Sequence, residues 1–362
     1  MNKPDYLLIL LIFIFVCFGF LMLSSATAPY AVNKFDDAYY YVKNQLKGLF
    51  GGLVLFWIFS RTDYRIFKKY SNWILGGTIF LLILVLIPGI GATYGKGARS
   101  WINIPFFGFQ PAELAKLGLM IFLSAWLEFK IISSRSSFWD IFIKFLLILG
   151  GVVGLVLLQP DMGTSAIIVL IALIVYFVAG GPLSHFGILG AIGAIGTFIL
   201  VKIAPYRMAR FTAFLDPSAD PLGVSYQINQ ALLAIGSGRF FGVGLLHSRQ
   251  KLMYLPEVSA DSIFAVIGEE LGFFLCVIFI AALVLFFIRG IKAASGAPDF
   301  FGKLLAAGIV GWIVTQSFIN IGAILSLMPL TGLPLPFISY GGSALMTALA
   351  GCGILVNISK WS

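Results

Sequence analysis

Three ionisable residues of this chain stand inside or directly beside long apolar stretches. Glu113 and Lys116 are three residues apart within the apolar run Pro111–Leu127, and Asp261 comes just before the run that begins at Ile263. The three-residue spacing places Glu113 and Lys116 on one face of a helix. Because ionisable groups at membrane depth are costly and usually functional, these residues are the first candidates for chemistry.

Each candidate also has a structural explanation. Lys116 neutralises Glu113 if the two form an intrahelical ion pair, and the pair taken alone favours this stabilising role. A carboxylate at the head of a helix, as expected for Asp261, caps the helix. The same carboxylate is a general base if a substrate hydroxyl group reaches it. The sequence position alone leaves both roles open for Asp261.

Basic residues occur in the long polar segment between Pro205 and Asp261. Arg207 and Arg210 are about one helical turn apart, so their guanidinium groups are spaced to bind phosphate oxygens, and Lys251 adds a third positive charge. Arginines at a membrane boundary also extend toward the interface without binding a ligand, and this explanation is equally supported. The charge of this segment fits an anionic lipid headgroup or a diphosphate better than nucleic acid.

Several other polar residues are expected to have structural roles. Asp161 follows Pro160 and precedes an apolar run, which predicts a helix N-cap. Glu269 and Glu270 are adjacent on a predicted helix, so we expect at most one of them to face the interior. Gln316 and Asn320, four residues apart in an apolar run, share a face and are expected to form hydrogen bonds between helices.

Glycine and proline mark the irregular parts of the chain. Ala234–Gly238 and Gly242–Gly244 permit tight turns but match neither a P-loop nor a dinucleotide-binding fingerprint. Pro334–Ser343 contains two prolines and two glycines, which break a helix. Irregular backbone at membrane depth is tolerated where it is buried in protein or lines a cavity.

The composition indicates which elements position these residues. A hydrophobic fraction of 60%, only 11% charged residues and a mean hydropathy of +1.00 exclude a water-soluble globule. We predict an all-α polytopic membrane protein of about ten transmembrane helices, forming one domain over residues 1–362 with a large extracytoplasmic loop at 205–261. The predicted spans are Leu7–Leu23, Leu46–Ser60, Trp73–Ile87, Pro111–Leu127, Ile141–Leu158, Gly163–Ala179, Leu183–Ile203, Ile263–Ile288, Leu304–Leu327 and Ala344–Val356.

Basic residues in short loops predict the orientation. The loops after the second, fourth and eighth spans carry most of these residues, and they share one side if both termini are cytoplasmic. The basic residues that fall on the opposite side and weaken this count are Lys34, Lys43, Lys47, Lys96 and Arg99. Neither a disulfide nor a metal site is indicated, because the three cysteines have no partner spacing and the chain has only two histidines.

Taken together, the motifs resemble the SEDS family (shape, elongation, division and sporulation) of bacterial peptidoglycan polymerases. The stretches around Tyr226-Gln227, Ser248–Lys251 and Tyr254–Glu257 are more similar to its division-type members (FtsW) than to the rod-shape type (RodA). The matching order and spacing extend over nearly the whole chain: Trp101-Ile102, Gln110–Lys116, Gln159–Thr164, Arg207–Pro217, Ala234–Gly238, Leu255–Glu257, Asp261, Gly268–Gly272 and Pro334–Ser343.

The resemblance implies that lipid II, an undecaprenyl-diphosphate-linked disaccharide peptide, is polymerised on the outer face of the bacterial cytoplasmic membrane. It places the essential aspartate of the family at Asp261 and a functional Glu/Lys pair at Glu113 and Lys116. Arg207, Arg210 or Lys251 would stabilise the departing diphosphate, and a divalent cation (Mg²⁺ or Mn²⁺) is a candidate to share this task. It also implies a class B penicillin-binding transpeptidase as partner.

The chain departs from the family pattern next to Asp261. The family usually has His-Thr before this aspartate, whereas this chain has Ser259 and Ala260. Ala112 likewise replaces the usual serine of the Gln-Pro-Ser-Glu motif. Two other functions are compatible with a charged cavity and broken helices: a lipid II flippase, and a non-catalytic scaffold for a penicillin-binding protein. The requirement for Asp261 separates polymerisation from both.

Overall fold

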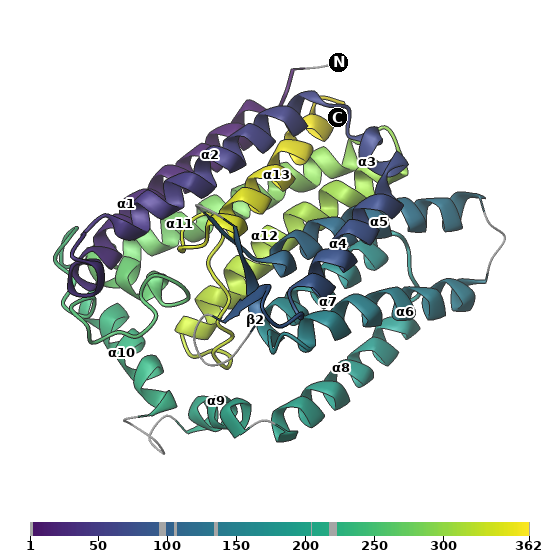
Figure 1. The fold of residues 1–362 in the computed structure, drawn as a ribbon. Coiled ribbons are helices and arrows are strands. Elements are labelled where there is room, and N and C mark those ends of the chain that lie inside the picture. The colour runs from purple at the N-terminus through teal and green to yellow at the C-terminus, as the bar shows by residue number, and fades with distance from the viewer. Residues whose placement is uncertain are drawn as a thin grey trace.

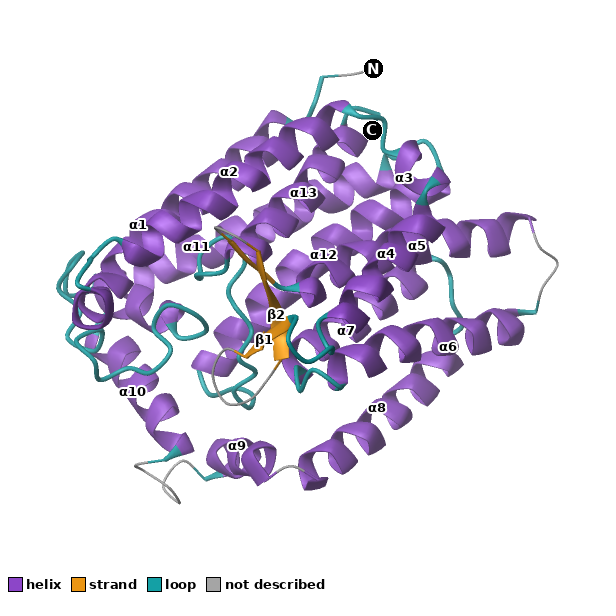
Figure 2. Ribbon diagram, in the orientation of Figure 1, coloured by secondary structure: helices purple, strands orange, loops and turns teal. Residues whose placement is uncertain are grey.

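The computed structural model describes residues 3–93, 99–104, 107–133, 137–203, 205–216 and 223–361. Most of this part of the chain is helical, as predicted (Figures 1 and 2). The helices are α1 (Tyr6–Phe35), α2 (Tyr40–Arg61), α3 (Arg65–Lys69), α4 (Ser71–Leu84), α5 (Pro111–Ser133), α6 (Phe138–Leu157), α7 (Met162–Val178), α8 (Leu183–Ile203), α9 (Pro205–Leu215), α10 (Val224–Ser237), α11 (Ile263–Ser295), α12 (Phe300–Ile324) and α13 (Gly342–Ser359).

Every predicted span overlaps one of these helices, but α1, α5 and α11 extend six to twelve residues beyond the predicted C-terminal ends, and α2 begins six residues before its predicted start. Within the described ranges, six helices are long and apolar enough to cross a membrane: α1, α6, α8, α11, α12 and α13. Two shorter helices, α4 and α7, are also apolar. The chain is therefore a helical polytopic membrane protein, and the count of ten spans remains a prediction.

The prediction of an all-α fold was wrong in one place. Strands β1 (Gly91–Thr93), β2 (Arg99–Ile104) and β3 (Phe107–Phe109) form an antiparallel sheet in the order β1-β2-β3 between α4 and α5. Ile102 pairs with Gly91 on one side and with Phe109 on the other. The stretch alternates apolar and polar residues only briefly, so its strands are too short for a clear sequence signal.

The predicted loop 205–261 also contains regular structure. Two helices, α9 and α10, occupy part of it, while residues 217–222 lie outside the described part of the chain. At the lower edge of Figure 1, α8 and α9 lie along the outside of the bundle. Only 6% of the apolar stretch of α8 is buried, compared with 83% for α12 and α13, so α12 and α13 form the centre of the bundle and α8 its periphery.

Close helix packing in the centre depends on small residues. Helix α13 runs along α2, and a Cβ atom at Gly48 would lie 2.5 Å from the Cα atom of Gly342. A Cβ atom at Gly353 would lie 2.7 Å from the carbonyl oxygen of Phe56. In membranes, where lipid is as apolar as a side chain, such close approach of backbones is a main source of helix association.

Both ends of the described chain lie at the same end of the bundle (Figure 1). The Asp5 backbone N–H donates to Ser359 Oγ at 3.2 Å, and Arg289 forms an ion pair with Asp5 at 2.6 Å. At this end Arg65 also pairs with Asp299 at 2.9 Å. Asp299 caps α12 by accepting from Gly302 N–H, and Asp161 caps α7 by accepting from Thr164 N–H, which confirms the predicted role of Asp161.

Helix α11 is broken at Gly272, where φ is +75° and ψ is −179°. Residues 239–244 cross the break and bind the main-chain groups that it leaves unpaired. Val243 and Gly244 N–H groups donate to the carbonyl oxygens of Glu269 and Glu270 at 2.9 and 3.0 Å. In the other direction, Phe273 and Phe274 N–H groups donate to the carbonyl oxygens at positions 239 and 240.

The crossing requires glycine at Gly272. A Cβ atom there would lie 2.2 Å from Gly242 N, and the left-handed φ is unfavourable for any other residue. We expect Gly272→Ala to lower the free energy of unfolding by about 2–5 kcal/mol through strain and overlap. The measurement is thermal unfolding of the purified protein in detergent.

The matched control is Gly76→Ala in α4, where no atom lies within 4 Å of the added Cβ. Alanine at a helical position without contacts should leave stability unchanged or slightly raised. Equal unfolding temperatures for the two variants would contradict the account of the crossing.

Candidate active site

Asp261 is the last residue of a series of turns that leads into α11, and its side chain is buried with 7% exposed. Gln227 of α10 donates through Nε2 to Asp261 Oδ1 at 3.2 Å and to Ser262 Oγ at 3.0 Å. The N-cap of α11 is Ser262, and no side chain caps the helix there. The carboxylate of Asp261 is therefore held by Gln227 and Ser262, and it does not serve as a helix cap.

The main chain around Asp261 is attached to the irregular segment before α13. The carbonyl oxygen of Asp261 accepts from Asn320 Nδ2 at 2.9 Å, and the same amide donates to the carbonyl oxygen of Leu333 at 2.8 Å. Tyr340 N–H donates to the carbonyl oxygen of Ser259 at 2.8 Å, and Ser339 Oγ donates to that of Ala260. Asp261 is thus fixed to the centre of the bundle, which restricts its position.

Burial raises the pKa of the Asp261 carboxyl group from 3.8 to about 6. The neighbouring carboxylate of Glu257 is the second cause of this rise, and the guanidinium group of Arg210 opposes it, so that the pKa of about 6 is the net result. Glu257 lies in the turn that precedes Asp261. Its φ of +51° is an unfavourable backbone conformation for a residue other than glycine. A carboxylate with a pKa near 6 is still ionised at neutral pH and is more basic than an ordinary aspartate.

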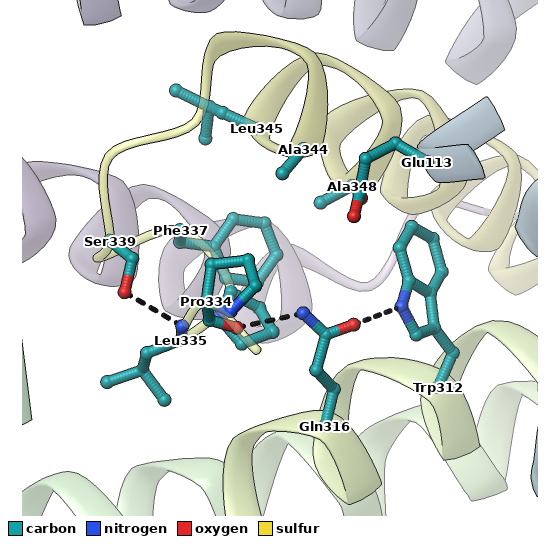
Figure 3. Close-up of a pocket in the computed structure, with 11 residues that line it drawn as sticks. Glu113, Trp312, Gln316, Pro334, Leu335, Phe337, Ser339, Ala344, Leu345 and Ala348 are labelled. Atoms are coloured by element: carbon teal, nitrogen blue, oxygen red, sulfur yellow. Dashed lines mark hydrogen bonds between the residues drawn. The ribbon is translucent and has the colours of Figure 1, made fainter. Parts of the chain in front are cut away.

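Glu113 and Lys116 form a fully buried ion pair. Lys116 Nζ lies 2.8 Å from Glu113 Oε1, 3.1 Å from Gln316 Oε1 and 4.9 Å from the ring centre of Trp312. Figure 3 shows Glu113 across a small cavity from Gln316, which donates to the carbonyl oxygen of Pro334 at 2.8 Å. The cavity of about 10 Å³ has room for roughly one water molecule.

The ion pair and Asp261 are linked through α12. Gln316 and Asn320, one turn apart as predicted, bind the carbonyl oxygens of Pro334 and Leu333 in the same irregular segment. Gln316 also contacts Lys116, and Asn320 contacts Asp261. In the described part of the chain no hydrogen bond or ion pair joins Asp261 directly to Glu113 or Lys116. The structure therefore brings the predicted residues into one network but not into contact.

The two arginines bind different elements. Both lie on α9, where Arg207 Nη1 donates to the carbonyl oxygen of Leu200 at 3.1 Å, near the end of α8. Arg210 Nη1 lies 3.4 Å from the carbonyl oxygen of Leu330, in the irregular segment, and its charge acts on Asp261. Of the two, Arg210 is the one placed beside the candidate base.

Lys251 is held in a buried ion pair. Its Nζ lies 2.6 Å from Glu270 Oε1 and donates to Ser25 Oγ at 3.0 Å. The ammonium group therefore contacts Glu270 and α1, and the carboxylate of Glu270 neutralises its charge. The structure thus gives Lys251 a role in holding the outer segment to α1 and α11.

The expectation that only one of Glu269 and Glu270 faces the interior was wrong, because both are buried. Glu270 binds Lys251, whereas Glu269 accepts from Ser248 Oγ and from Arg249 N–H, the latter at 2.9 Å. The reason is the crossing at Gly272: residues 239–251 wrap around the short helix Ile263–Leu271 and cover a face that a lone helix would expose.

A cavity of about 1000 Å³ opens beside the turn that carries Asp261. One wall is the turn itself, from Met253 to Ala260, and the other walls come from α1, α2, β2 and α10. Seven of the lining residues are tyrosine or tryptophan: Tyr30, Tyr40, Tyr41, Trp101, Tyr226, Tyr254 and Tyr340. A substrate in this cavity would therefore lie directly beside the turn that holds Asp261.

Sequence reasoning missed two residues of this site. Gln227 was noted only as part of the resemblance, and Glu257 only as part of the Leu255–Glu257 motif. Neither residue lies in an apolar run. The argument that a polar or charged residue inside an apolar run is functional therefore did not identify them. For a polar residue in a segment that joins two spans, only the three-dimensional structure identifies the residue that it contacts.

Within the described residues, no group of three or more His, Cys, Asp or Glu side chains is arranged to hold a metal ion. Mg²⁺ in phosphate-binding sites is commonly held by one or two carboxylates together with substrate phosphate oxygens. A divalent cation at this site would thus take most of its ligands from a diphosphate and from water.

Comparisons with known proteins agree with this architecture. The family model FtsW/RodA/SpoVE, described as cell cycle protein, matches residues 5–362. The chain is 41% identical to stage V sporulation protein E of Bacillus subtilis over all of this chain and 98% of that protein. It is 39% identical to the probable peptidoglycan glycosyltransferase FtsW of Geobacter sp. strain M18, with 98% of this chain and 96% of that one covered.

Solved structures lead to the same conclusion. A structure described as a peptidoglycan synthase complex that coordinates polymerization and crosslinking matches with a TM-score of 0.79 at 30% identity over 98% of this chain and 97% of that one. The rod shape determining protein RodA of Thermus thermophilus matches with a TM-score of 0.72 at 30% identity over 98% and 96%. The chain belongs to the FtsW/RodA/SpoVE family, which confirms the resemblance predicted from the motifs.

The buried ion pair gives a testable prediction. Glu113→Gln leaves the Lys116 ammonium group without a counter-charge in the bundle centre, which should lower the free energy of unfolding by about 3–5 kcal/mol. Lys116→Met in the same protein should recover part of this loss because it removes the unpaired charge. Thermal unfolding of the two single variants and the double variant measures the coupling.

Glu128→Gln is the control, since Glu128 is also buried but the side chain of its ion-pair partner Lys68 is 47% exposed. Its loss of stability should be smaller because the remaining ammonium group stays in contact with solvent. Strictly additive effects of Glu113→Gln and Lys116→Met would mean that the two residues do not interact.

Proposed function

We propose that this protein polymerises lipid II into glycan strands, with Asp261 as the general base. The observation that carries the proposal is the position of Asp261: a buried carboxylate with a raised pKa, fixed to the bundle centre beside a large cavity. Membership of the family and its similarity to probable peptidoglycan glycosyltransferases of the FtsW type support the activity.

In the proposed reaction Asp261 accepts the proton of the sugar 4-hydroxyl group of one lipid II molecule. The oxygen then forms a bond to the anomeric carbon of the growing strand, and the bond from this carbon to the diphosphate oxygen breaks. The undecaprenyl diphosphate leaves with the electron pair, and the configuration at the anomeric carbon inverts. Asp261 later releases its proton to solvent through the cavity.

The departing diphosphate requires positive charge close to Asp261. Arg210 is the best-placed candidate, because it acts on Asp261 and contacts the segment that binds the Asp261 turn. Arg207, one turn away on α9, is the second candidate. Lys251 contributes indirectly, by holding the outer segment in place through Glu270.

The same proposal includes the setting of the reaction. We place both termini in the cytoplasm and the cavity on the outer side of the bacterial cytoplasmic membrane, with about ten spans. Most basic residues of the short loops lie at the end of the bundle that holds the termini, which supports this orientation. A class B penicillin-binding transpeptidase is the proposed partner, supported by the similarity to a synthase complex that couples polymerization to crosslinking.

Asp261→Asn tests the general base. Asparagine keeps the size of the side chain and its hydrogen bond to Gln227, so folding should be retained, while the proton acceptor is lost. We expect lipid II polymerisation by the purified protein with its partner to fall by ~10²–10⁴-fold. Lipid II binding should change little, because the proposed diphosphate ligands are intact.

Asp140→Asn, an exposed position on α6, is the control and should keep wild-type activity. Near-normal polymerisation by folded Asp261→Asn protein would exclude Asp261 as the base and favour a flippase or a scaffold. A flippase would still move lipid II between leaflets after this change, so the two activities should be measured on the same preparation.

The raised pKa of Asp261 predicts the dependence of the rate on pH. A general base works only when it is deprotonated, so the rate should be constant above about pH 7 and fall as pH drops through about 6. An ordinary aspartate, with a pKa of 3.8, would keep the rate constant to about pH 5. A profile that is flat from pH 7 to pH 5 would contradict the assignment.

A further inference from the structure

The outer rim of the large cavity is formed by the end of α1 and the start of α2. Tyr30 and Lys34 come from α1, and Tyr40, Asn44 and Lys47 come from α2. These residues face the turn that precedes Asp261 from the other side of the cavity. None of them is used in the proposed transfer of the proton or the diphosphate.

The end of α1 extends beyond the length needed to cross the apolar core of a bilayer. Helix α1 has 30 residues, so it is about 45 Å long, whereas the hydrocarbon core of a bilayer is about 30 Å thick. If the apolar core begins at Tyr6, it ends near Ser25, and Lys34 lies roughly 14 Å farther out along the helix. The diphosphate of a membrane-anchored substrate stays at headgroup level, so Lys34 meets a part of the substrate farther from the lipid.

The lysines in and near the rim differ in whether a carboxylate neutralises their charge. Lys43 of α2 forms an ion pair with Asp37 at 2.8 Å and does not belong to the cavity lining. Lys34 and Lys47, which line the cavity, contact neutral groups in the described structure: Tyr30 OH at 3.4 Å and Asn44 Oδ1 at 2.8 Å. Two exposed positive charges without a carboxylate partner from the described protein thus face the cavity.

The aromatic lining adds a second requirement on the ligand. Tyrosine and tryptophan present an apolar ring face and a polar edge, which suits a ligand that alternates apolar faces with hydroxyl or amide groups. Saccharide rings and peptide groups have this character. The rim therefore fits a saccharide that carries an anionic peptide.

We propose that Lys34 and Lys47 bind carboxylate groups of the peptide carried by the lipid-linked disaccharide, and that the tyrosines of the rim contact its sugar and peptide groups. This inference rests on the proposed function and specifies the part of the substrate that the rim recognises. The rim holds the substrate by its peptide, while Arg210 remains the ligand for the diphosphate. Lys34 and Lys47 are thus positioning residues, which affect binding and not the proton transfer.

The test uses the full-length protein with its partner and two substrates, lipid II and the same lipid-linked disaccharide without its peptide. The double variant Lys34→Gln/Lys47→Gln should raise KM for lipid II by roughly three- to thirtyfold, as expected for two partly exposed ion pairs, and change kcat little. On the peptide-free substrate the ratio of the KM values of variant and wild type should fall toward one. Lys43→Gln is the matched control and should leave KM for lipid II at the wild-type value.

A binding measurement separates this inference from the proposed function. A soluble disaccharide-peptide, titrated into the wild-type protein by calorimetry, should bind more weakly to Lys34→Gln/Lys47→Gln, whether or not the protein polymerises lipid II. If the wild type does not polymerise lipid II, the proposed function fails while this binding result still decides the inference.

Two results would overturn the inference. An equal rise in KM on both substrates would mean that the lysines bind the diphosphate, which both substrates share. Unchanged binding of the disaccharide-peptide and unchanged KM would mean that the rim does not hold the peptide.

Discussion

The structure depends on one constraint: main-chain polar groups at membrane depth must find hydrogen-bond partners within the protein. In the described chain, the break at Gly272 and the irregular segment before α13 are places where a helix does not supply these partners. At the first, residues 239–244 pair with the free groups on both sides of the break. At the second, the side-chain amides of Gln316 and Asn320 bind the carbonyl oxygens of Pro334 and Leu333. The candidate active site lies between the break at Gly272 and the irregular segment before α13.

The buried charges follow the same logic. Glu113 is neutralised by Lys116, and Glu270 by Lys251, while Glu269 is satisfied by hydrogen bonds from residues 248–250. Asp261 differs from these, because its carboxylate accepts hydrogen bonds from Gln227 and Ser262, and among the described residues no ion pair neutralises it. A carboxylate that keeps its basicity in this way is suited to take a proton, whereas the paired carboxylates are suited to hold segments together.

The sequence predicted the helical fold and most spans, because a bilayer imposes a strong and continuous hydrophobic pattern. It also predicted that Asp161 caps a helix, since this role depends on local spacing. The predicted hydrogen bonds between helices are confirmed for Gln316, which binds Lys116 of α5, but Asn320 binds carbonyl oxygens outside the helices. The sheet at 91–109, the burial of both Glu269 and Glu270, and the contact of Gln227 with Asp261 were not predicted. Each of these arises from segments far apart in the chain that wrap around or lie beside one another, and local patterns do not record such contacts.

The crossing at Gly272 also affects how force passes through the molecule. The short helix Ile263–Leu271 has Asp261 next to one end and the crossing at the other, and main-chain hydrogen bonds tie the crossing to both sides of the break. We therefore expect a push on the lipid-facing half of α11, starting at Phe273, to reach Asp261 as a displacement of the whole short helix instead of being absorbed by a flexible joint.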